Sequence, residues 1–189
     1  HRVNEAKAAP SARDTAAGVG PGAPVNPVMQ GEGSRKYEMK RVVGTGGMGV
    51  IYEAVDLKCD RPVAIKVLLE ERRKQDGAQD RFTHEAKITA QLEHPNIVPI
   101  HELGTEVGGN IFYSMKLVQG VTLADVLVDI RKGRQYVIEK YPLGRLLTIF
   151  QKVCDAIAFS HGKGVFHRDL KPSNVLIGEY GEVLVLDWG

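Results

Sequence analysis

The chain has 189 residues, 43% of them hydrophobic, which is enough for one ordinary folded domain with its own core. Its formal net charge is only +2, because 25 Lys and Arg residues are scattered among 23 Asp and Glu residues. This mixed surface excludes the concentrated basic patch of a nucleic-acid-binding protein, so we expect no nucleic-acid partner.

The first part of the chain differs in composition from the rest. Residues 1–35 are rich in Ala, Gly and Pro and hold almost no aromatic or large aliphatic side chains, which predicts a disordered tail or linker. From Tyr37 the pattern changes: "YEMKRVVGTGGMGVIYEAVD" (37–56) predicts two strands joined by a glycine-rich turn. "RPVAIKVLLE" (61–70) predicts a third strand by its β-branched content.

A helix and two short strands are predicted next. "RFTHEAKITAQLEH" (81–94) predicts a helix that places Phe82, Ile88 and Leu92 on one stripe. Pro95 is expected to stop this helix. "IVPIHEL" (97–103) and "NIFYSMKLV" (110–118) predict the two strands.

The last third of the chain is predicted to be mainly helical. "TLADVLVDI" (122–130) predicts a short helix, and residues 131–142 an exposed charged connection. A longer helix over 143–161 places an apolar stripe toward a core, made of Leu146, Phe150, Val153 and Ile157. Two short apolar runs around "GEYG" (178–181) then predict a hairpin.

The glycine-rich turn is a candidate phosphate-binding loop. Gly44, Gly46 and Gly49 have the spacing G-x-G-x-x-G, and glycine lets backbone amides approach a phosphate without a Cβ in the way. A strand follows these glycines, whereas a dinucleotide-binding fingerprint would open a helix, and no Walker-type G-K-[ST] is present. A plain flexible hairpin is the alternative interpretation.

A lysine and a glutamate on apolar faces are a candidate ion pair. Period-two alternation puts Lys66 on the same strand face as Ala64, and helical spacing puts Glu85 near the stripe of its own helix. Taken separately, Lys66 is equally explained as an edge lysine with a solvated head, and Glu85 as a residue at the margin of its stripe. Taken together, they suggest a desolvated pair that could hold Lys66 against a phosphate.

"HRDLKPSN" (167–174) is the strongest local signal for chemistry. In this segment Asp169 could accept a proton from a hydroxyl group. Lys171 could neutralise the charge of a transferring phosphoryl group, and Asn174 could offer an oxygen to Mg²⁺. Asp187, at the end of the apolar run "VLVLD", would supply a second oxygen ligand. An ordinary charged turn is the alternative interpretation of either segment.

These motifs together resemble those of the protein kinase family and occur in its order. "GTGGMGV" resembles the glycine-rich loop, "VAIK" the lysine strand, Glu85 the helix partner, "HRDLKPSN" the catalytic loop and "DWG" the magnesium-binding tripeptide. The Lys171-Pro172 pair is similar to the serine/threonine-specific branch, in particular to bacterial eukaryotic-like kinases. The resemblance implies an α+β, two-lobed fold: residues 36–118 as a complete small lobe and hinge, and 119–189 as the first part of a mainly helical large lobe.

The resemblance also implies an activity and a set of site residues. It implies transfer of a phosphoryl group from ATP to a Ser or Thr hydroxyl of a protein substrate, with ATP and Mg²⁺ as cofactors. The implied catalytic residues are Asp169, Lys171, Lys66 and Glu85, and the implied metal ligands are Asn174 and Asp187. The residues implied to contact ATP are Val43, Gly44, Thr45, Gly46, Gly47, Met48, Gly49, Val50, Ala64, Lys66, Met115, Lys116, Val118 and Leu176.

The sequence departs from the family pattern at several points. Trp188 replaces the usual Phe of the tripeptide, and Lys116 stands where the family favours an acid. No activation segment and no A-P-E motif follow Gly189, so we expect the 189 residues by themselves not to phosphorylate a protein. A nucleotide-binding pseudokinase or scaffold is the alternative function.

Cysteine usage and the absence of a long apolar run suggest a compartment. Cys59 and Cys154 form no metal-binding or disulfide pattern, which favours a reducing, cytoplasmic setting. No apolar run reaches the roughly 18 residues of a membrane-spanning helix. Because the chain begins at His1, a targeting segment or membrane span outside it is left open, as is location at the cytoplasmic face of a membrane.

Overall fold

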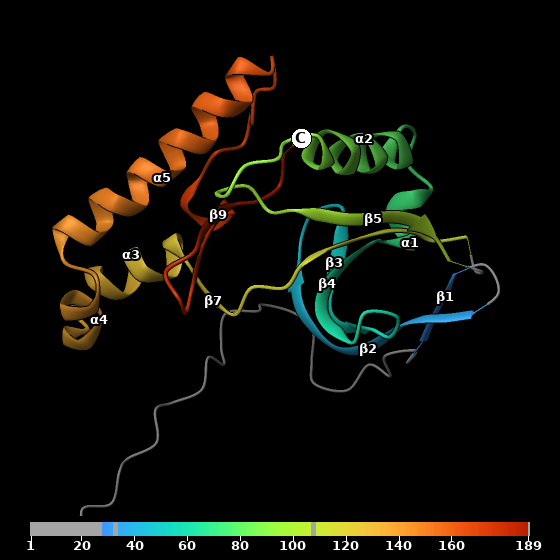
Figure 1. The fold of residues 1–189 in the computed structure, drawn as a ribbon, viewed down its shortest axis with the longest axis horizontal. Helices are drawn as coiled ribbons and strands as arrows, with labels where there is room; N and C mark the ends of the chain where they lie inside the picture. Colours follow the sequence, from blue (N-terminus) through green and yellow to red (C-terminus); the bar gives the residue numbers. More distant parts are fainter. Residues whose placement is uncertain (1–27, 32–33, 107–108, 189) are drawn as a thin grey trace, which may run out of the picture.

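The computed structural model describes residues 28–31, 34–106 and 109–188. They form two lobes, one built on a curved sheet and covered by a helix, the other mainly helical (Figure 1). The α+β class and the two-lobed arrangement expected from the sequence are confirmed.

The small lobe contains a six-stranded antiparallel sheet in the order β1-β2-β3-β4-β6-β5. Its strands are β1 Val28–Gly31, β2 Ser34–Thr45, β3 Gly49–Asp56, β4 Arg61–Leu68, β5 Ile100–Thr105 and β6 Ile111–Lys116. All the predicted strands of this lobe are present. The prediction of disorder over 1–35 is wrong for β1, which pairs with β2, while residues 1–27 lie outside the described residues.

Strand β5 begins later than predicted because of a proline. Pro99 has no N–H to donate to a ladder, so residues 97–99 do not extend the strand. Ile97 instead forms an isolated parallel bridge with Val185 of the large lobe, and Val98 donates its N–H to the Val185 carbonyl at 3.3 Å. Residues 97 and 98 thus make a backbone contact between the two lobes.

Two helices, α1 Glu70–Arg73 and α2 Ala78–Ala90, follow strand β4. Helix α2 ends four residues earlier than predicted, well before Pro95. The N–H groups of Gln91 and Leu92 bond to the carbonyls of Ile88 and Thr89 at 3.0 and 3.1 Å, so the last turn tightens and the chain leaves the helix there.

The sheet carries a core on each face, as the alternation of β4 predicts. Val63 and Ile65 belong to one cluster of buried residues, with Tyr37, Met39, Ala54 and Phe112. Ala64 and Leu68 belong to the other cluster, which packs under α2 with Phe82, Ala86, Val98, Tyr113 and Met115. Lys66 shares the second face, so its ammonium group is carried beneath α2.

The large lobe combines helices α3 Leu123–Arg131, α4 Gln135–Lys140 and α5 Leu143–Gly162 with the short 3₁₀ helix Pro172–Asn174. A small sheet has the order β7 Gly120–Thr122, β8 Val175–Gly178 and β9 Val183–Val185, so the predicted hairpin is confirmed. The predicted exposed connection over 131–142 is wrong: it contains α4 and buries Val137 and Tyr141 in the core of the lobe.

Helix α5 confirms the predicted span but not the predicted buried face. Phe150, expected in the core, is 65% exposed, whereas Val153 of the same stripe is buried. The buried face of this helix is made of Ile149, Val153, Ala156 and Ser160. Leu143, Leu147 and Phe150 form an exposed apolar stripe on its other side. Within the described ranges, no helix is both long enough and apolar enough to cross a membrane.

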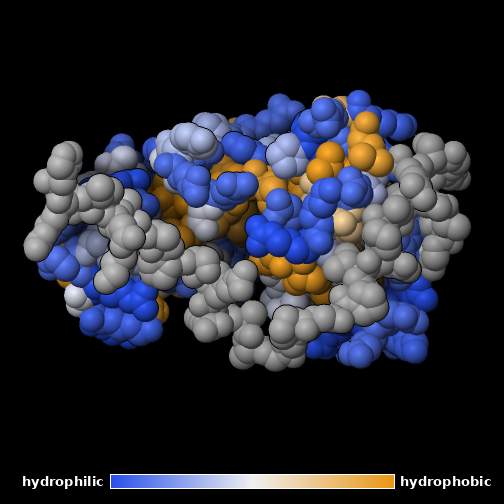
Figure 2. All heavy atoms as spheres, turned by 90° about the horizontal axis from the view of Figure 1, so that it is seen from below, coloured by the Kyte–Doolittle hydropathy of each residue, from blue (hydrophilic) through white to orange (hydrophobic). Residues whose placement is uncertain are grey.

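The chain passes from one lobe to the other through residues 117–119, and strand β7 then pairs at once with β8. Gly120 lies opposite Gly178, and a Cβ on Gly120 would overlap the carbonyl oxygen of Ile177. The surface in the hollow between the lobes is largely apolar and is flanked by hydrophilic surface (Figure 2). The connection is therefore short, and it borders a hollow lined by both lobes.

Candidate functional site

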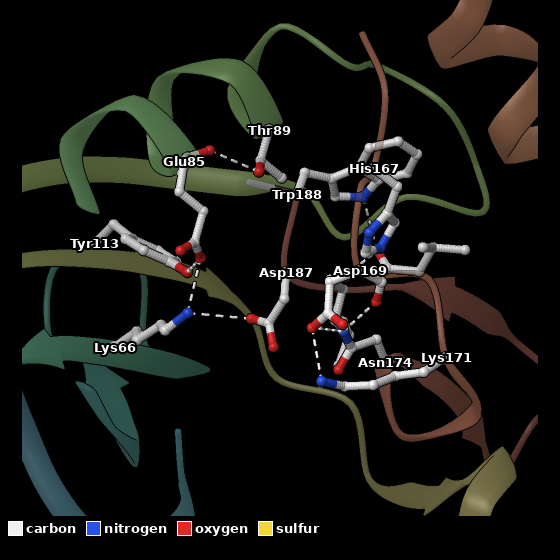
Figure 3. A network of polar contacts seen from close by, with 12 residues as sticks. Lys66, Glu85, Thr89, Tyr113, His167, Asp169, Lys171, Asn174, Asp187 and Trp188 are labelled. Carbon is white, nitrogen blue, oxygen red and sulfur yellow. Dashed lines mark hydrogen bonds and ion pairs between the residues drawn. The ribbon is translucent and has the colours of Figure 1, made fainter. Parts of the chain in front are cut away.

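Polar side chains from both lobes meet at this hollow (Figure 3). Lys66 comes from β4, Glu85 from α2, and Asp187 from the segment that follows β9. Asp169 and Asn174 come from the loop and 3₁₀ helix between α5 and β8. The site is thus assembled from segments far apart in the sequence.

Lys66 lies between two carboxylates. Its Nζ is 2.7 Å from Oε1 of Glu85 and 3.1 Å from Oδ1 of Asp187. The side chains of Lys66 and Glu85 are 6% and 9% exposed, so the predicted desolvated pair is present. Burial by itself lowers the pKa of Lys66, but the charges of Asp187 and Glu85 outweigh it and raise the pKa above its ordinary value. Lys66 therefore remains a cation at neutral pH.

Tyr113 is a site residue that the sequence reasoning missed. Its hydroxyl donates to Oε1 of Glu85 at 2.6 Å, the same oxygen that accepts from Lys66. On β6 it stands directly opposite Lys66 in the ladder with β4. Period-two alternation along 110–118 would have shown that Tyr113 and Met115 share a face. That Tyr113 lies opposite Lys66 depends on the register between two strands, which no local pattern reveals.

The loop between α5 and β8 holds its charged groups close together. Oδ2 of Asp169 accepts a hydrogen bond from Nζ of Lys171 at 2.6 Å, and the Asn174 amide donates to the Asp169 carbonyl at 3.0 Å. The Asp169 side chain is 62% exposed and faces the hollow as an accessible carboxylate. The hydrogen bond from Lys171 is the main reason that the pKa of Asp169 lies below its ordinary value.

Replacing Lys171 with methionine should raise the pKa of Asp169 toward its ordinary value of about 3.8. The substitution removes both the hydrogen bond and the positive charge that favour the carboxylate. Carbon NMR titration of the Asp169 carboxyl carbon would measure this. Lys163→Met, which removes an exposed cation outside the loop, should leave the titration unchanged. A pKa of Asp169 that stays the same in Lys171→Met would contradict the assignment.

Backbone and ring contacts join this loop to the segment after β9. The N–H of Leu186 donates to the Asn174 carbonyl at 2.9 Å, and Nε2 of His167 donates to the Leu186 carbonyl at 2.9 Å. The ring of Trp188 is fully buried, with its centroid 4.7 Å from that of His167. The indole N–H donates to the Val185 carbonyl at 3.2 Å, a bond that phenylalanine could not make. Trp188 thus fixes the backbone on either side of Asp187.

The predicted catalytic and metal-binding residues form two groups in the structure. Lys66, Glu85 and Asp187 are joined by ion pairs, and Asp169, Lys171 and Asn174 by hydrogen bonds. Among the described residues no ion pair or side-chain hydrogen bond joins one group to the other. The backbone bond from Leu186 to Asn174 connects them instead.

The glycine-rich turn closes over the β4 end of the site. The Gly46 N–H bonds to the Gly49 carbonyl at 2.8 Å, and a Cβ on Gly49 would overlap the backbone of Val67, next to Lys66. Around Gly47 a Cβ would meet nothing, so this part of the turn borders open space. Val43 and Thr45 are exposed on β2, and Met48 and Val50 are half-buried. Of the four glycines in this turn, only Gly49 is required to be glycine by a close approach to another strand.

Several of the residues implied to contact ATP lie near the connection between the lobes. Ala64 and Met115 are cross-strand neighbours on β4 and β6, both buried, and Leu176 is half-buried on β8 of the other lobe. The Lys116 N–H is already bound to the Pro99 carbonyl at 3.1 Å. Of the Lys116 main chain, only the carbonyl is therefore left to meet a ligand, together with the main chain of Val118.

No group of three or more His, Cys, Asp and Glu side chains that could hold a metal occurs in the part of the chain that the structure describes. The candidate ligands are one carboxylate, Asp187, and one amide oxygen, that of Asn174, whose amide nitrogen bonds to Asp169. Mg²⁺ typically binds one or two protein oxygens and takes its remaining ligands from water and phosphate. The residues present therefore fit this ion.

Comparison with known sequences finds relatives over most of the chain. Residues 37–189 match the profile of the family described as "Protein kinase domain". The chain is 39% identical over 158 residues to the serine/threonine-protein kinase PknD of Chlamydia muridarum, covering 82% of this chain and 17% of that protein. It is 38% identical over 157 residues to PknD of Chlamydia pneumoniae, with the same two coverages. The chain thus spans about a sixth of the length of these relatives.

Solved structures with a similar fold include the kinase domain of Mycobacterium tuberculosis PknI. One match has a TM-score of 0.63 with 26% identity and covers 81% of this chain and 59% of that one. A second structure of the same domain gives a TM-score of 0.64 with 27% identity and covers 81% of this chain and 58% of that one. The likeness therefore extends over both lobes described above.

Proposed function

Because this chain belongs to the protein kinase family, we propose that the protein transfers the γ-phosphoryl group of ATP to a serine or threonine hydroxyl of a protein substrate. The observation that carries the proposal is the position of Lys66. Its charged ammonium is held by Glu85 at the edge of the hollow and faces Asp187 from the other lobe. The similarity to serine/threonine kinases supports the choice of acceptor.

ATP is the proposed phosphoryl donor, held where the two lobes meet. Gly47 lies beside open space in the turn, where its backbone N–H could meet a phosphate, whereas the Gly46 N–H is bound to the Gly49 carbonyl. Ala64 and Met115 from one lobe and Leu176 from the other supply apolar surface for a base. Lys66 would balance the negative charge of the phosphates. Glu85, which is buried together with Lys66, would hold the ammonium group in place.

Mg²⁺ is the proposed metal, with Asp187 and the Asn174 oxygen as its protein ligands. When bound, such an ion neutralises charge on the transferring phosphates. Asp187 lies 3.1 Å from Lys66, so the two side chains present opposite charges to the same space. The buried Trp188 and its bond to Val185 keep Asp187 at this position.

Asp169 is the proposed group that receives the substrate hydroxyl. Its carboxylate is exposed and, because its pKa is lowered, ionised throughout the physiological range. An ionised carboxylate can orient a hydroxyl and accept its proton as the phosphoryl group is transferred. Lys171, 2.6 Å from Asp169, would balance charge on the transferring group. Most of the catalysis would then rest on positioning and charge neutralisation.

The cytoplasm, or the cytoplasmic face of a membrane, is the proposed location, where ATP and protein substrates are available. The two cysteines are free and exposed in the structure, which suits a reducing compartment. The mixed surface charge supports a protein partner and no nucleic acid.

The proposal is tested with the purified protein, ATP, Mg²⁺ and a generic protein acceptor such as casein. We expect phosphoserine or phosphothreonine, detected by mass spectrometry, from the longest natural form of the protein. The 189 residues alone should bind Mg·ATP in calorimetry without phosphorylating the acceptor, because the exposed stripe of Leu143, Leu147 and Phe150 is an apolar patch of the kind that leads to aggregation. Binding without transfer in every form would favour a scaffold, and no binding would contradict the proposal.

A further inference from the structure

The hydroxyl of Tyr113 occupies a position that the proposed chemistry does not yet use. Tyr113 and Lys66 are directly opposite in the β4–β6 ladder, so their side chains leave the sheet on the same side, beneath α2. Oε1 of Glu85 accepts from both of them, at 2.6 Å from Oη and 2.7 Å from Nζ. One carboxylate oxygen on α2 is thus tied to two strands at once.

The ring of Tyr113 adds further contacts to the same group. Its centroid lies 5.1 Å from that of Phe82, one turn before Glu85 on α2, and 5.7 Å from Nζ of Lys66. Tyr113 is only 3% exposed. A single residue of β6 therefore touches both the helix and the ammonium group.

The direction of the Tyr113 hydrogen bond is fixed by its surroundings. An ionised carboxylate can only accept, so the hydroxyl must donate. Burial first, and then the charge of Glu85, raise the pKa of Tyr113 well above that of a free tyrosine. The hydroxyl consequently keeps its proton at neutral pH.

We propose that the Tyr113 hydroxyl is a positioning group that orients Glu85, and through it Lys66, for nucleotide binding, an inference that rests on the proposed kinase function. Lys66 has three N–H bonds, of which one is used by Glu85 and one by Asp187. With Tyr113 as a second donor to Glu85, the carboxylate stays in place when Lys66 turns partly toward a phosphate. An outward shift of α2 must then break two bonds rather than one.

The test compares Tyr113→Phe with a matched control, Tyr52→Phe, in the same sheet. Both substitutions remove one hydroxyl and keep the ring, and Tyr52 is a half-buried residue of β3 outside the site. Affinity for a non-hydrolysable ATP analogue with Mg²⁺ is measured by calorimetry. We expect Tyr113→Phe to weaken binding about three- to tenfold, in line with the net contribution of one ordinary hydrogen bond, and Tyr52→Phe to leave it unchanged.

A double-mutant cycle separates positioning through Glu85 from a general structural effect. In a Glu85→Ala background the Tyr113→Phe change should weaken binding by less than about 1.5-fold, because its partner is gone. Equal weakening in both backgrounds, unchanged affinity in Tyr113→Phe alone, or a Tyr113→Phe protein that no longer folds would each overturn the inference. Failure of the unsubstituted protein to bind the analogue would instead contradict the proposed function.

Discussion

Asp169→Asn should lower kcat for protein phosphorylation by about 10²–10⁴-fold, the range typical of losing a general base. An amide has nearly the shape of the carboxylate but cannot take the hydroxyl proton. The KM for ATP should stay within about threefold, because no ion pair or side-chain hydrogen bond of the described residues links Asp169 to Lys66. Steady-state kinetics with saturating acceptor protein measure both constants.

Asp155→Asn is the matched control for this change. Asp155 is an exposed carboxylate on α5, far along the chain from the loop that holds Asp169, and kcat should not respond to it. A value of kcat for Asp169→Asn above about one tenth of the unsubstituted value would show that Asp169 only orients its surroundings. A large rise in the KM for ATP would place Asp169 in the nucleotide site instead.

Lys66→Met should destabilise the protein and abolish measurable nucleotide binding. Removing one partner of a buried ion pair costs about 3–5 kcal/mol, because the other charge is left buried. Here the hydroxyl of Tyr113 still donates to Glu85, so we expect the lower end of that range. Denaturant unfolding gives the stability, and calorimetry with Mg·ATP gives the binding.

A second substitution separates the two effects of losing Lys66. Lys66→Met combined with Glu85→Gln leaves no buried charge, and the Gln oxygen can still accept from Tyr113, so stability should largely recover while binding remains lost. Lys87→Met, an exposed lysine of α2, serves as the control for loss of charge alone. Recovery of binding in the double variant would contradict the assignment of Lys66.

The stability that Lys66 contributes depends on pH in a way that follows from the direction of its pKa shift. Because the pKa of the folded state is raised above 10.5, the stabilisation by Lys66 is fully present below that pH. It is lost only as the pH rises through the higher pKa of the folded protein. Lys66 therefore cannot account for any loss of stability between neutral pH and pH 10.5.

Local patterns predicted the parts of the site that depend on one element at a time. The alternation of β4 placed Lys66 on an apolar face with Ala64, and helical spacing placed Glu85 near the apolar stripe of its helix, so two separate patterns suggested the pair that the structure contains. The role of Tyr113 was not predicted because it depends on the register between β4 and β6. Strand β7 was not predicted either, because its three residues form a strand through their pairing with β8 and show no strand pattern of their own.

The error over Phe150 has a physical origin in how small residues pack. Apolar residues on α5 allow two overlapping stripes, and the prediction chose the one with the larger side chains. The helix instead buries the side that carries Ala156 and Ser160, both 0% exposed, where small side chains let it approach β9 closely. Hydrophobicity alone does not distinguish a stripe that packs closely from one that is merely apolar.

The short connection between the lobes is held at both ends by sheet pairing. The ladder of β6 ends at Lys116 and that of β7 begins at Gly120, and the Gln119 carbonyl already accepts from the Glu179 N–H at 3.1 Å. Within this connection, Leu117 and Val118 are therefore the least constrained residues. Because Gly120 has no room for a Cβ against Ile177, any side chain there must push β7 away from β8. We therefore expect a side chain at position 120 to loosen β7 and lengthen the connection between the lobes, while every group proposed to contact phosphate or hydroxyl stays intact.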